Sequence, residues 1–366
     1  MKKIGAILLS VLLTLSAAAC SQNGQAGSSA QTGTNSLGSS SSQISSNSSK
    51  PNSSTHSSVK DSSIAGPSSS HAASSEEEDI ITVPDPGPSG HEAHYCYPLL
   101  TDRQKEYYNI MHDAVNNLQI HWIVLGKADA NYKTDIAVVR NALVNDHPNV
   151  FWLPSYYATA LGTDEKGEST ALVYFSATSG GEPSYLTGRN EKERMAEELD
   201  AAVEKIVSKV TAKTQYEIEL QLHDLLCAEV SYAENTDDPM VYTAYGALVG
   251  KRAVCEGYAR AFQLLLSKFN IQAVTVAGVA GGEGHMWNAV KLYDEWYHVD
   301  ATWNDSKVGG ISHEYFNVPD GIITADHTIN KNAHQISNEI LAQGKTSFNI
   351  YTPPCDGTEY NYFNRT

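Results

Sequence analysis

The chain has 366 residues, with 25 basic and 42 acidic side chains and a formal net charge of −17 at pH 7. Residues 76–366 carry almost all of this charge, with 21 basic and 41 acidic residues and therefore a formal net charge of 21 − 41 = −20. Such an excess of negative charge argues against nucleic acid and anionic lipid as binding partners. The length of residues 92–366 is enough for one large domain or two small ones.

The first twenty residues, MKKIGAILLSVLLTLSAAAC, are typical of an export signal. Two lysines precede an apolar run that is too short to cross a bilayer, and small residues follow it. We therefore expect a signal peptide over residues 1–19. The three alanines before Cys20 resemble a bacterial lipobox, which predicts lipidation of Cys20 and anchoring at the outer face of the bacterial cytoplasmic membrane. The alternative is ordinary cleavage after an A-x-A site, which would give a freely secreted protein.

Residues 20–90 are predicted to be a disordered linker that begins at the lipidated Cys20. From Ser21 to about Ser75 the chain is mostly Ser, with Asn, Gln, Gly, Thr and Ala. This composition is too poor in aromatic and branched side chains to offset the entropy cost of ordering the chain. A coil of this length spans roughly 40 Å, so it would hold a domain clear of a lipid surface.

The N-terminal part of the folded region, residues 91–210, is predicted to be a helical α+β region. Some segments have apolar residues at helical spacing, which predicts helices. Others alternate between apolar and polar residues, which predicts strands. Thr101 or Asp102 is a plausible N-cap for the first helix. The predicted helices cover 100–118, 133–148 and 190–210, and the predicted strands cover 150–161 and 169–177.

The second part, residues 211–366, is predicted to be the core domain. A helix over 216–232 precedes a second helix that starts at Cys255 and continues to Leu266. Three strands should follow, over 271–280, 285–293 and 295–303, and the last two form a hairpin. Helices followed by a mainly antiparallel sheet indicate an α+β fold.

Three residues suited to nucleophilic catalysis occur in order along this core. Cys255 lies at a helix start, His285 at a strand start and Asp300 in the next strand. A cysteine reacts as its thiolate, which a helix N-terminus and a nearby imidazolium both favour. An imidazole can take the thiol proton and return it to a leaving amine, and a carboxylate can orient that imidazole. The alternatives for Cys255 are a disulfide partner or a buried residue without chemistry.

The hairpin provides a geometric test of this arrangement. A two-residue turn at 293–294 or 294–295 places His285 and Asp300 on the same face of the sheet, within reach of each other. A turn with an odd number of residues places them on opposite faces. The turn sequence Tyr-Asp-Glu contains no glycine, so the sequence leaves the turn type open.

The segments VCEGYARAF, GHMWNAV and WYHVDATWND, which contain these three residues, resemble the three motifs of the transglutaminase-like superfamily of cysteine enzymes. The spacings, 285 − 255 = 30 residues and 300 − 285 = 15 residues, are also similar. The resemblance runs from about Tyr216 through Asp305. It implies a papain-like core, in which the nucleophile helix packs on an antiparallel sheet that bears the histidine and the aspartate.

The resemblance also implies roles for individual residues. Cys255 would be the nucleophile, His285 the general base and acid, and Asp300 the orienting carboxylate. The oxyanion would bind the backbone N–H of Cys255 and one upstream side-chain donor, for which Tyr245 and Tyr242 are candidates.

Two further residues are close enough to the motifs to be considered. Trp287 is expected to line the core or the cleft. His298 is a rival base, because it shares a face with Asp300 two residues away. The family motif favours His285 over His298.

The remaining cysteines have simpler interpretations. Cys227 lies near the apolar face of its predicted helix and is expected to be an inert core residue. Cys96 and Cys355 flank the folded region, and they are either a disulfide or two free thiols.

No metal and no other cofactor is expected from the sequence. HEAH, residues 91–94, is one residue short of the HExxH spacing of zinc proteases, and the nearby Cys96 does not complete a known metal motif.

The sequence therefore predicts a cell-surface thiol enzyme that acts on amide bonds of extracellular proteins or peptides. Hydrolysis and transfer of an acyl group to an amine share the same thioester, and the sequence does not decide between peptidase and acyltransferase. The sequence also gives no indication of oligomeric state. Two alternatives stay open: a non-catalytic binding module with the same fold, and a lipoprotein that captures a ligand for a transporter.

Overall fold

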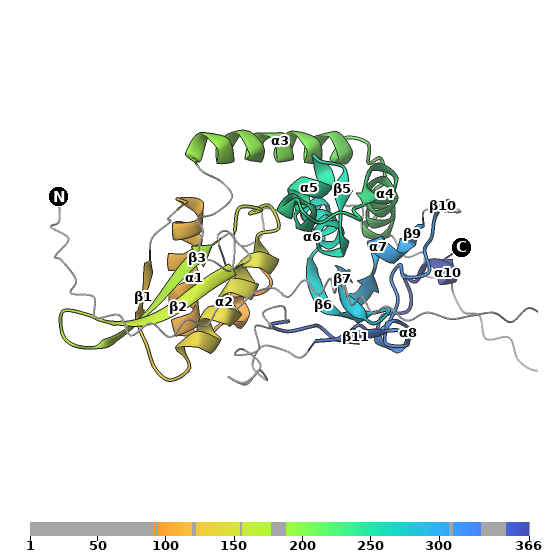
Figure 1. Ribbon diagram of the computed structural model, residues 1–366. Coiled ribbons are helices and arrows are strands. Elements are labelled where there is room, and N and C mark those ends of the chain that lie inside the picture. The colour runs from red at the N-terminus through yellow and green to blue at the C-terminus, as the bar shows by residue number, and fades with distance from the viewer. Residues whose placement is uncertain are drawn as a thin grey trace, which may run out of the picture. The chain divides into compact units, whose positions relative to one another are not determined.

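The computed structural model describes residues 91, 94–118, 122–153, 156–176, 188–306, 310–330 and 349–365. The predicted signal peptide, Cys20 and the linker lie outside these residues. Figure 1 shows the elements in chain order. The N-terminal part contains η2 (Tyr97–Leu99), α1 (Asp102–Asn116), β1 (Ile123–Lys127), α2 (Tyr132–Asp146), β2 (Tyr156–Thr163), β3 (Ser169–Ser176) and α3 (Arg189–Val207).

The core continues with α4 (Gln215–Glu229), β4 (Ser231–Tyr232), η3 (Pro239–Tyr242), α5 (Ala244–Leu248), β5 (Arg252–Ala253), α6 (Cys255–Ser267), β6 (Ala273–Ala280), β7 (Glu283–Leu292) and β8 (Glu295–Val299). The last described elements are α7 (Ala301–Asn304), β9 (Asp305–Ser306), β10 (Gly310–Ile311), α8 (Asp320–Ile323), β11 (His327–Ile329) and α10 (Tyr362–Arg365). The prediction of an α+β fold is confirmed.

The N-terminal half contains a three-stranded antiparallel sheet in the order β1-β3-β2. Helix α1 packs against α2 and β1. The helix begins where the sequence predicts, because the Thr101 side chain accepts from the backbone N–H of Gln104 while the Gln104 side chain accepts from the backbone N–H of Thr101. This reciprocal capping box satisfies two N–H groups at the helix start.

One predicted strand in this half is wrong at its start, and one strand was missed. The strand predicted from residue 150 begins only at Tyr156, because Phe151 and Trp152 lie in a turn closed by a hydrogen bond from Leu153 N to Val150 O. Both aromatic side chains are buried in that turn, which explains the strand-like apolar pattern. Strand β1 was not predicted, since it has only five residues and its register shifts between Val124 and Gly126.

The core sheet has four antiparallel strands in the order β11-β6-β7-β8. Helix α6 packs against β6 and β7, and Asn288 Nδ2 of β7 donates to Ala259 O of α6 over 3.0 Å. The side chains that α6 buries include Tyr258, Phe262 and Leu265. The helix start that carries Cys255 is therefore held on the sheet.

The end of α2 is hydrogen-bonded to the core. Arg260 Nη1 donates to Val144 O over 3.0 Å, and Gln263 Nε2 donates to Asn145 O over 2.7 Å. The backbone N–H of Thr275 on β6 donates to Asn145 Oδ1 over 2.9 Å. The nucleophile helix α6 is thus tied to the N-terminal half through α2. No helix among the described residues is long and apolar enough to span a bilayer.

Candidate active site

The β7–β8 hairpin brings His285 and Asp300 together. Leu292 pairs with Glu295, so the turn consists of Tyr293 and Asp294 alone. This confirms one of the two predicted turns. The strand predicted over 295–303 is too long, because β8 ends at Val299 and Asp300 begins the cap of α7. Tyr293 supplies the left-handed backbone that a two-residue turn requires, with φ of 52° despite its side chain. His285 Nε2 lies 2.7 Å from Asp300 Oδ2.

Cys255 is the first residue of α6 and is half-buried. Val254 N donates to Val241 O over 3.0 Å, which fixes the backbone just before the nucleophile. Gly257, in the first turn, allows this close approach, because a Cβ there would lie 2.5 Å from Val241 O. Cys255 is a neighbour of His285, since it contributes to the raised pKa of that imidazole. Asp300 lies against Nε2 of the ring, which leaves Nδ1 for a contact with the sulfur.

Asp300 is fully buried and every contact it makes favours the carboxylate. Its Oδ1 caps α7 by accepting from Thr302 N over 3.0 Å and from Trp303 N over 3.1 Å. Burial opposes the charge, but the hydrogen bonds from His285 and His327 outweigh it and lower the pKa of Asp300. The carboxylate is therefore fixed in place and in charge, as an orienting group must be.

His285 is held in its protonated form by its surroundings. Burial disfavours the charge, but hydrogen bonds to Asp300 and to Cys255, together with the charges of both, raise the pKa of His285 to about 10. A raised pKa of this origin describes an imidazolium held against the Asp300 carboxylate. An imidazolium close to a cysteine is the kind of partner that activates a thiol as a nucleophile.

His327 on β11 is a site residue that sequence reasoning missed. Its Nε2 lies 3.1 Å from Asp300 Oδ2, and its Nδ1 lies 2.6 Å from Asp326 Oδ1. The ring is buried against Trp287 and Trp303. No sequence motif predicts His327, because it comes close to Asp300 only through the pairing of β11 with β6.

We expect His327→Gln to lower kcat/KM about 10- to 100-fold, the range for losing one hydrogen bond to a charged group. The variant removes a contact that lowers the pKa of Asp300, so the acid limb of the pH profile should move to higher pH. Kinetics across pH on the purified variant check this. A purely structural role would lower the active fraction and leave the shape of the pH profile unchanged.

A cleft of about 310 Å³ opens beside His285. It is lined by Tyr232, Ala280, Gly281, Glu283, Gly284, His285, Thr302 and Trp303. Tyr232 was not a sequence candidate. The residue is 42% exposed. Burial is the largest cause of the raised pKa of Tyr232, and the charge of Cys255 is the second largest. Tyr232 and His285 therefore line the same cleft.

The residues proposed for the oxyanion and the cleft lie in different surroundings. Tyr245 Oη donates to Glu198 Oε2 over 2.5 Å, so its hydroxyl hydrogen is already used. Tyr242, at the end of η3, is half-buried against the cluster of Ala233, Val241 and Val254. Trp287 is 1% exposed and stacks beside the His285 ring at 6.0 Å. It therefore backs the site from the core, and it is absent from the cleft lining.

The rival base His298 is engaged elsewhere. Its Nδ1 accepts from Trp287 Nε1 over 3.0 Å, and its Nε2 lies 2.8 Å from Asp320 Oδ1. The ring is completely buried. Both nitrogens are therefore occupied within the core.

All four described cysteines are free. Cys96 and Cys355 are buried thiols, so of the two alternatives the structure has the free thiols and lacks the disulfide between them. Cys227 is buried, and its Sγ lies 3.4 Å from Ala301 O. Burial raises the pKa of all three of these thiols, which makes them poor nucleophiles beside the half-buried Cys255.

Comparison with known proteins agrees with this geometry. Residues 201–301, which include Cys255, His285 and Asp300, match the model of the transglutaminase-like superfamily. The chain is 28% identical to kyphoscoliosis peptidase of Homo sapiens over 105 residues, which is 25% of this chain and 16% of that protein. It is 30% identical to kyphoscoliosis peptidase of Mus musculus over 98 residues, which is 23% of this chain and 15% of that protein.

The matched segment therefore spans about 16% of the length of the human relative. A crystal structure of a TGase is similar over 50% of this chain and 50% of that chain, with 11% identity and a TM-score of 0.30. The predicted resemblance is confirmed for the segment that holds the three residues, and we identify residues 201–301 as a transglutaminase-like domain.

Proposed function

We propose that the protein is a thiol enzyme that acts on amide bonds of proteins or peptides through Cys255, His285 and Asp300. The observation that carries the proposal is the buried contact of 2.7 Å between His285 and Asp300, next to a half-buried cysteine at a helix start. Such an arrangement is costly to maintain without a use, because it places ionised groups in the interior.

The proposed reaction begins with the Cys255 thiolate attacking the amide carbonyl carbon. The C–N bond breaks, the amine leaves with the proton of the His285 imidazolium, and a thioester remains. Water then attacks the thioester and gives up its proton to His285, which releases the acid and restores the thiolate. A primary amine in place of water gives a new amide instead, so hydrolysis and transfer differ only in the second nucleophile.

The oxyanion of each tetrahedral intermediate would be stabilised by two donors. The first N–H groups of α6 have no partner within the helix, and that of Cys255 is adjacent to the reacting carbon. We propose the Tyr232 hydroxyl as the second donor, since Tyr232 lines the cleft and its titration responds to the charge on Cys255. Tyr245 is less suited, because it already donates to Glu198.

The cleft suits an extended peptide that carries a cationic group. Glu283 provides a carboxylate, and Tyr232 and Trp303 provide aromatic faces, which together favour a lysine or arginine side chain. A lysine amine held there could also act as the second nucleophile. With the predicted lipid anchor at Cys20, the substrates would be extracellular proteins or peptides at the outer face of the membrane.

Product analysis tests this proposal. The purified protein is incubated with a mixture of unstructured peptides, with and without a lysine-containing acceptor peptide, and the products are identified by mass spectrometry. Cleaved peptides indicate a peptidase, and amine-linked products that release ammonia indicate a transglutaminase-type enzyme. If neither product forms while a peptide is retained by the protein, the alternative of a non-catalytic binding module replaces the enzyme.

A further inference from the structure

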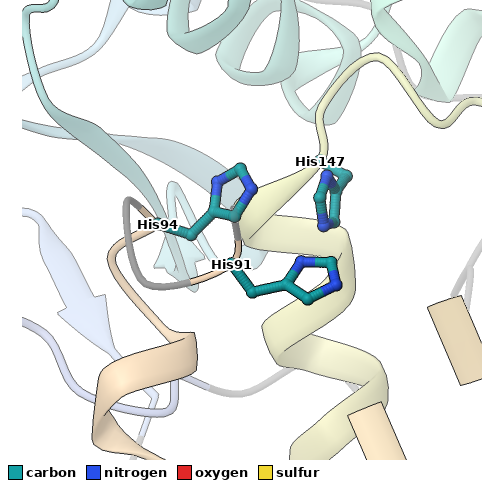
Figure 2. A group of neighbouring side chains, drawn as sticks. All are labelled: His91, His94 and His147. Atoms are coloured by element: carbon teal, nitrogen blue, oxygen red, sulfur yellow. The ribbon is translucent and has the colours of Figure 1, made fainter. Parts of the chain in front are cut away.

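Three histidines converge at the start of the described chain, far from the active-site motifs. The potential ligand atoms of His91, His94 and His147 all lie within 4.8 Å of one another. His94 and His147 have ring centroids 4.4 Å apart. Figure 2 shows His147 at the end of α2, with His91 and His94 opposite it on the segment that precedes η2.

These imidazoles differ from the other clustered histidines of the protein. The rings of His223, His298 and His327 each lie within 3.2 Å of a carboxylate oxygen, which provides each ring with a hydrogen-bond partner. Among the described residues, the ring nitrogens of His91 and His94 form no hydrogen bond and no ion pair. A shared cation would give both rings a partner.

The ring of His112 lies 4.7 Å from that of His147, but its Nε2 accepts from Asn116 Nδ2 over 2.9 Å, and it is not one of the three residues whose ligand atoms converge.

A buried relay orients His147. Tyr108 Oη donates to Asp146 Oδ2 over 3.1 Å and lies 2.9 Å from His147 Nε2. When the single hydroxyl hydrogen goes to the carboxylate, Nε2 donates to Tyr108 and the lone pair of His147 is on Nδ1. A ligand ring whose second nitrogen donates to a fixed acceptor is the usual support of a protein metal site.

We propose that His91, His94 and His147 bind one divalent transition-metal ion, with zinc as the best fit. Three imidazoles and a water complete a tetrahedral zinc site, and zinc accepts this ligand set readily. Zn–N bonds of about 2.0 Å place ligand nitrogens roughly 3.4 Å apart, so side-chain rotations would close the present separations. The site lies at the C-terminal end of α2, whose dipole favours a cation.

The ion would act as a clamp between the entry of the chain and the core. The same segment is already tied to α2, because Cys96 N and Tyr97 N donate to Asp146 over 2.8 and 3.0 Å. The residues before Asp146, Val144 and Asn145, accept from α6. Metal binding should therefore stabilise the contact between the N-terminal segment and the nucleophile helix. The HEAH motif alone did not predict this site, because the third ligand, His147, follows His94 by 147 − 94 = 53 residues.

Zinc and cobalt titrations of the full chain, without affinity-tag histidines, test the proposal. We expect one equivalent of zinc to bind and to raise the unfolding temperature. His94→Gln and His147→Gln should each weaken binding at least about 100-fold, and Tyr108→Phe should weaken it about 10- to 100-fold. His112→Gln is the matched control, since it removes a neighbouring ring that is not a ligand and should leave the affinity unchanged.

Cobalt separates this site from the active-site cysteine. The bound cobalt should show ligand-field bands without a thiolate-to-metal charge-transfer band, and Cys255→Ser should not change the spectrum. The proposal is overturned if no zinc binds, if the double variant His94→Gln/His147→Gln binds zinc as the wild type does, or if the spectrum shows thiolate ligation that Cys255→Ser removes. None of these outcomes depends on whether the protein is an enzyme.

Discussion

Replacing Cys255 by alanine is expected to lower amide-bond turnover by at least about 10⁴-fold, because the variant has no atom that can form the thioester. The fold should be unaffected, since the side chain is half-buried at a helix start and makes no core contact that a methyl group would lose. Turnover of the peptide substrate and the thermal unfolding temperature of the same preparation check both statements.

Cys227→Ala is the matched control for that variant. Cys227 is a second cysteine of the same domain, but it is buried, and burial raises the pKa of its thiol. Its removal should cost stability through the lost packing and leave the turnover of folded protein unchanged. An enzyme that keeps its activity without Cys255, or loses it without Cys227, would contradict the assignment of the nucleophile.

The Asp300→Asn variant is expected to lower kcat by about 10⁴-fold while the protein stays folded, the size of effect known for the same change in serine triads. An amide that donates to His285 Nε2 forces the hydrogen onto Nδ1, which then faces Cys255 and cannot take the thiol proton. Asparagine can still cap α7 through its side-chain oxygen, so the geometry should survive. Steady-state kinetics and a pH profile measure the effect.

The structure offers a close control for this variant. Asp320 of α8 accepts from His298 of β8 over 2.8 Å, and the thiol beside this pair, Cys355, is completely buried and has a pKa raised by burial. Asp320→Asn should change activity far less than Asp300→Asn, even if both variants lose similar stability. Equal losses of activity in the two variants would mean that Asp300 acts by holding the sheet together, and its role as an orienting residue would be wrong.

The sequence predicted the parts of the site that are local in the chain. Cys255, His285 and Asp300 lie within one helix and one hairpin, and local patterns are enough to place a residue at a helix start or on one face of a strand. The two-residue turn could be offered only as one option, because Tyr293 adopts a left-handed backbone that its residue type does not announce.

Residues brought in by long-range pairing could not be predicted. His327 reaches Asp300 through the antiparallel pairing of β11 with β6, and Tyr232 reaches the cleft through the short β4–β5 pair. His147, at the end of α2, and His94 are also far apart in the sequence but close in the structure. Contacts of this kind depend on which strands and helices become neighbours, and no local periodicity encodes that choice. Sheet order is therefore what separates the predicted part of the site from the part found in the structure.

The most direct test of the central claim is the pH dependence of alkylation at Cys255, followed by peptide mass spectrometry with the buried Cys227 as internal reference. The raised pKa of His285, about 10, implies an imidazolium at pH 6, and an imidazolium close to a cysteine favours thiol reactivity. We predict rapid alkylation of Cys255 at pH 6, where an ordinary thiol reacts slowly, and loss of that reactivity in His285→Ala. Alkylation that rises only near pH 8.5, with the same profile in His285→Ala, would contradict the thiolate–imidazolium pair and favour a binding module.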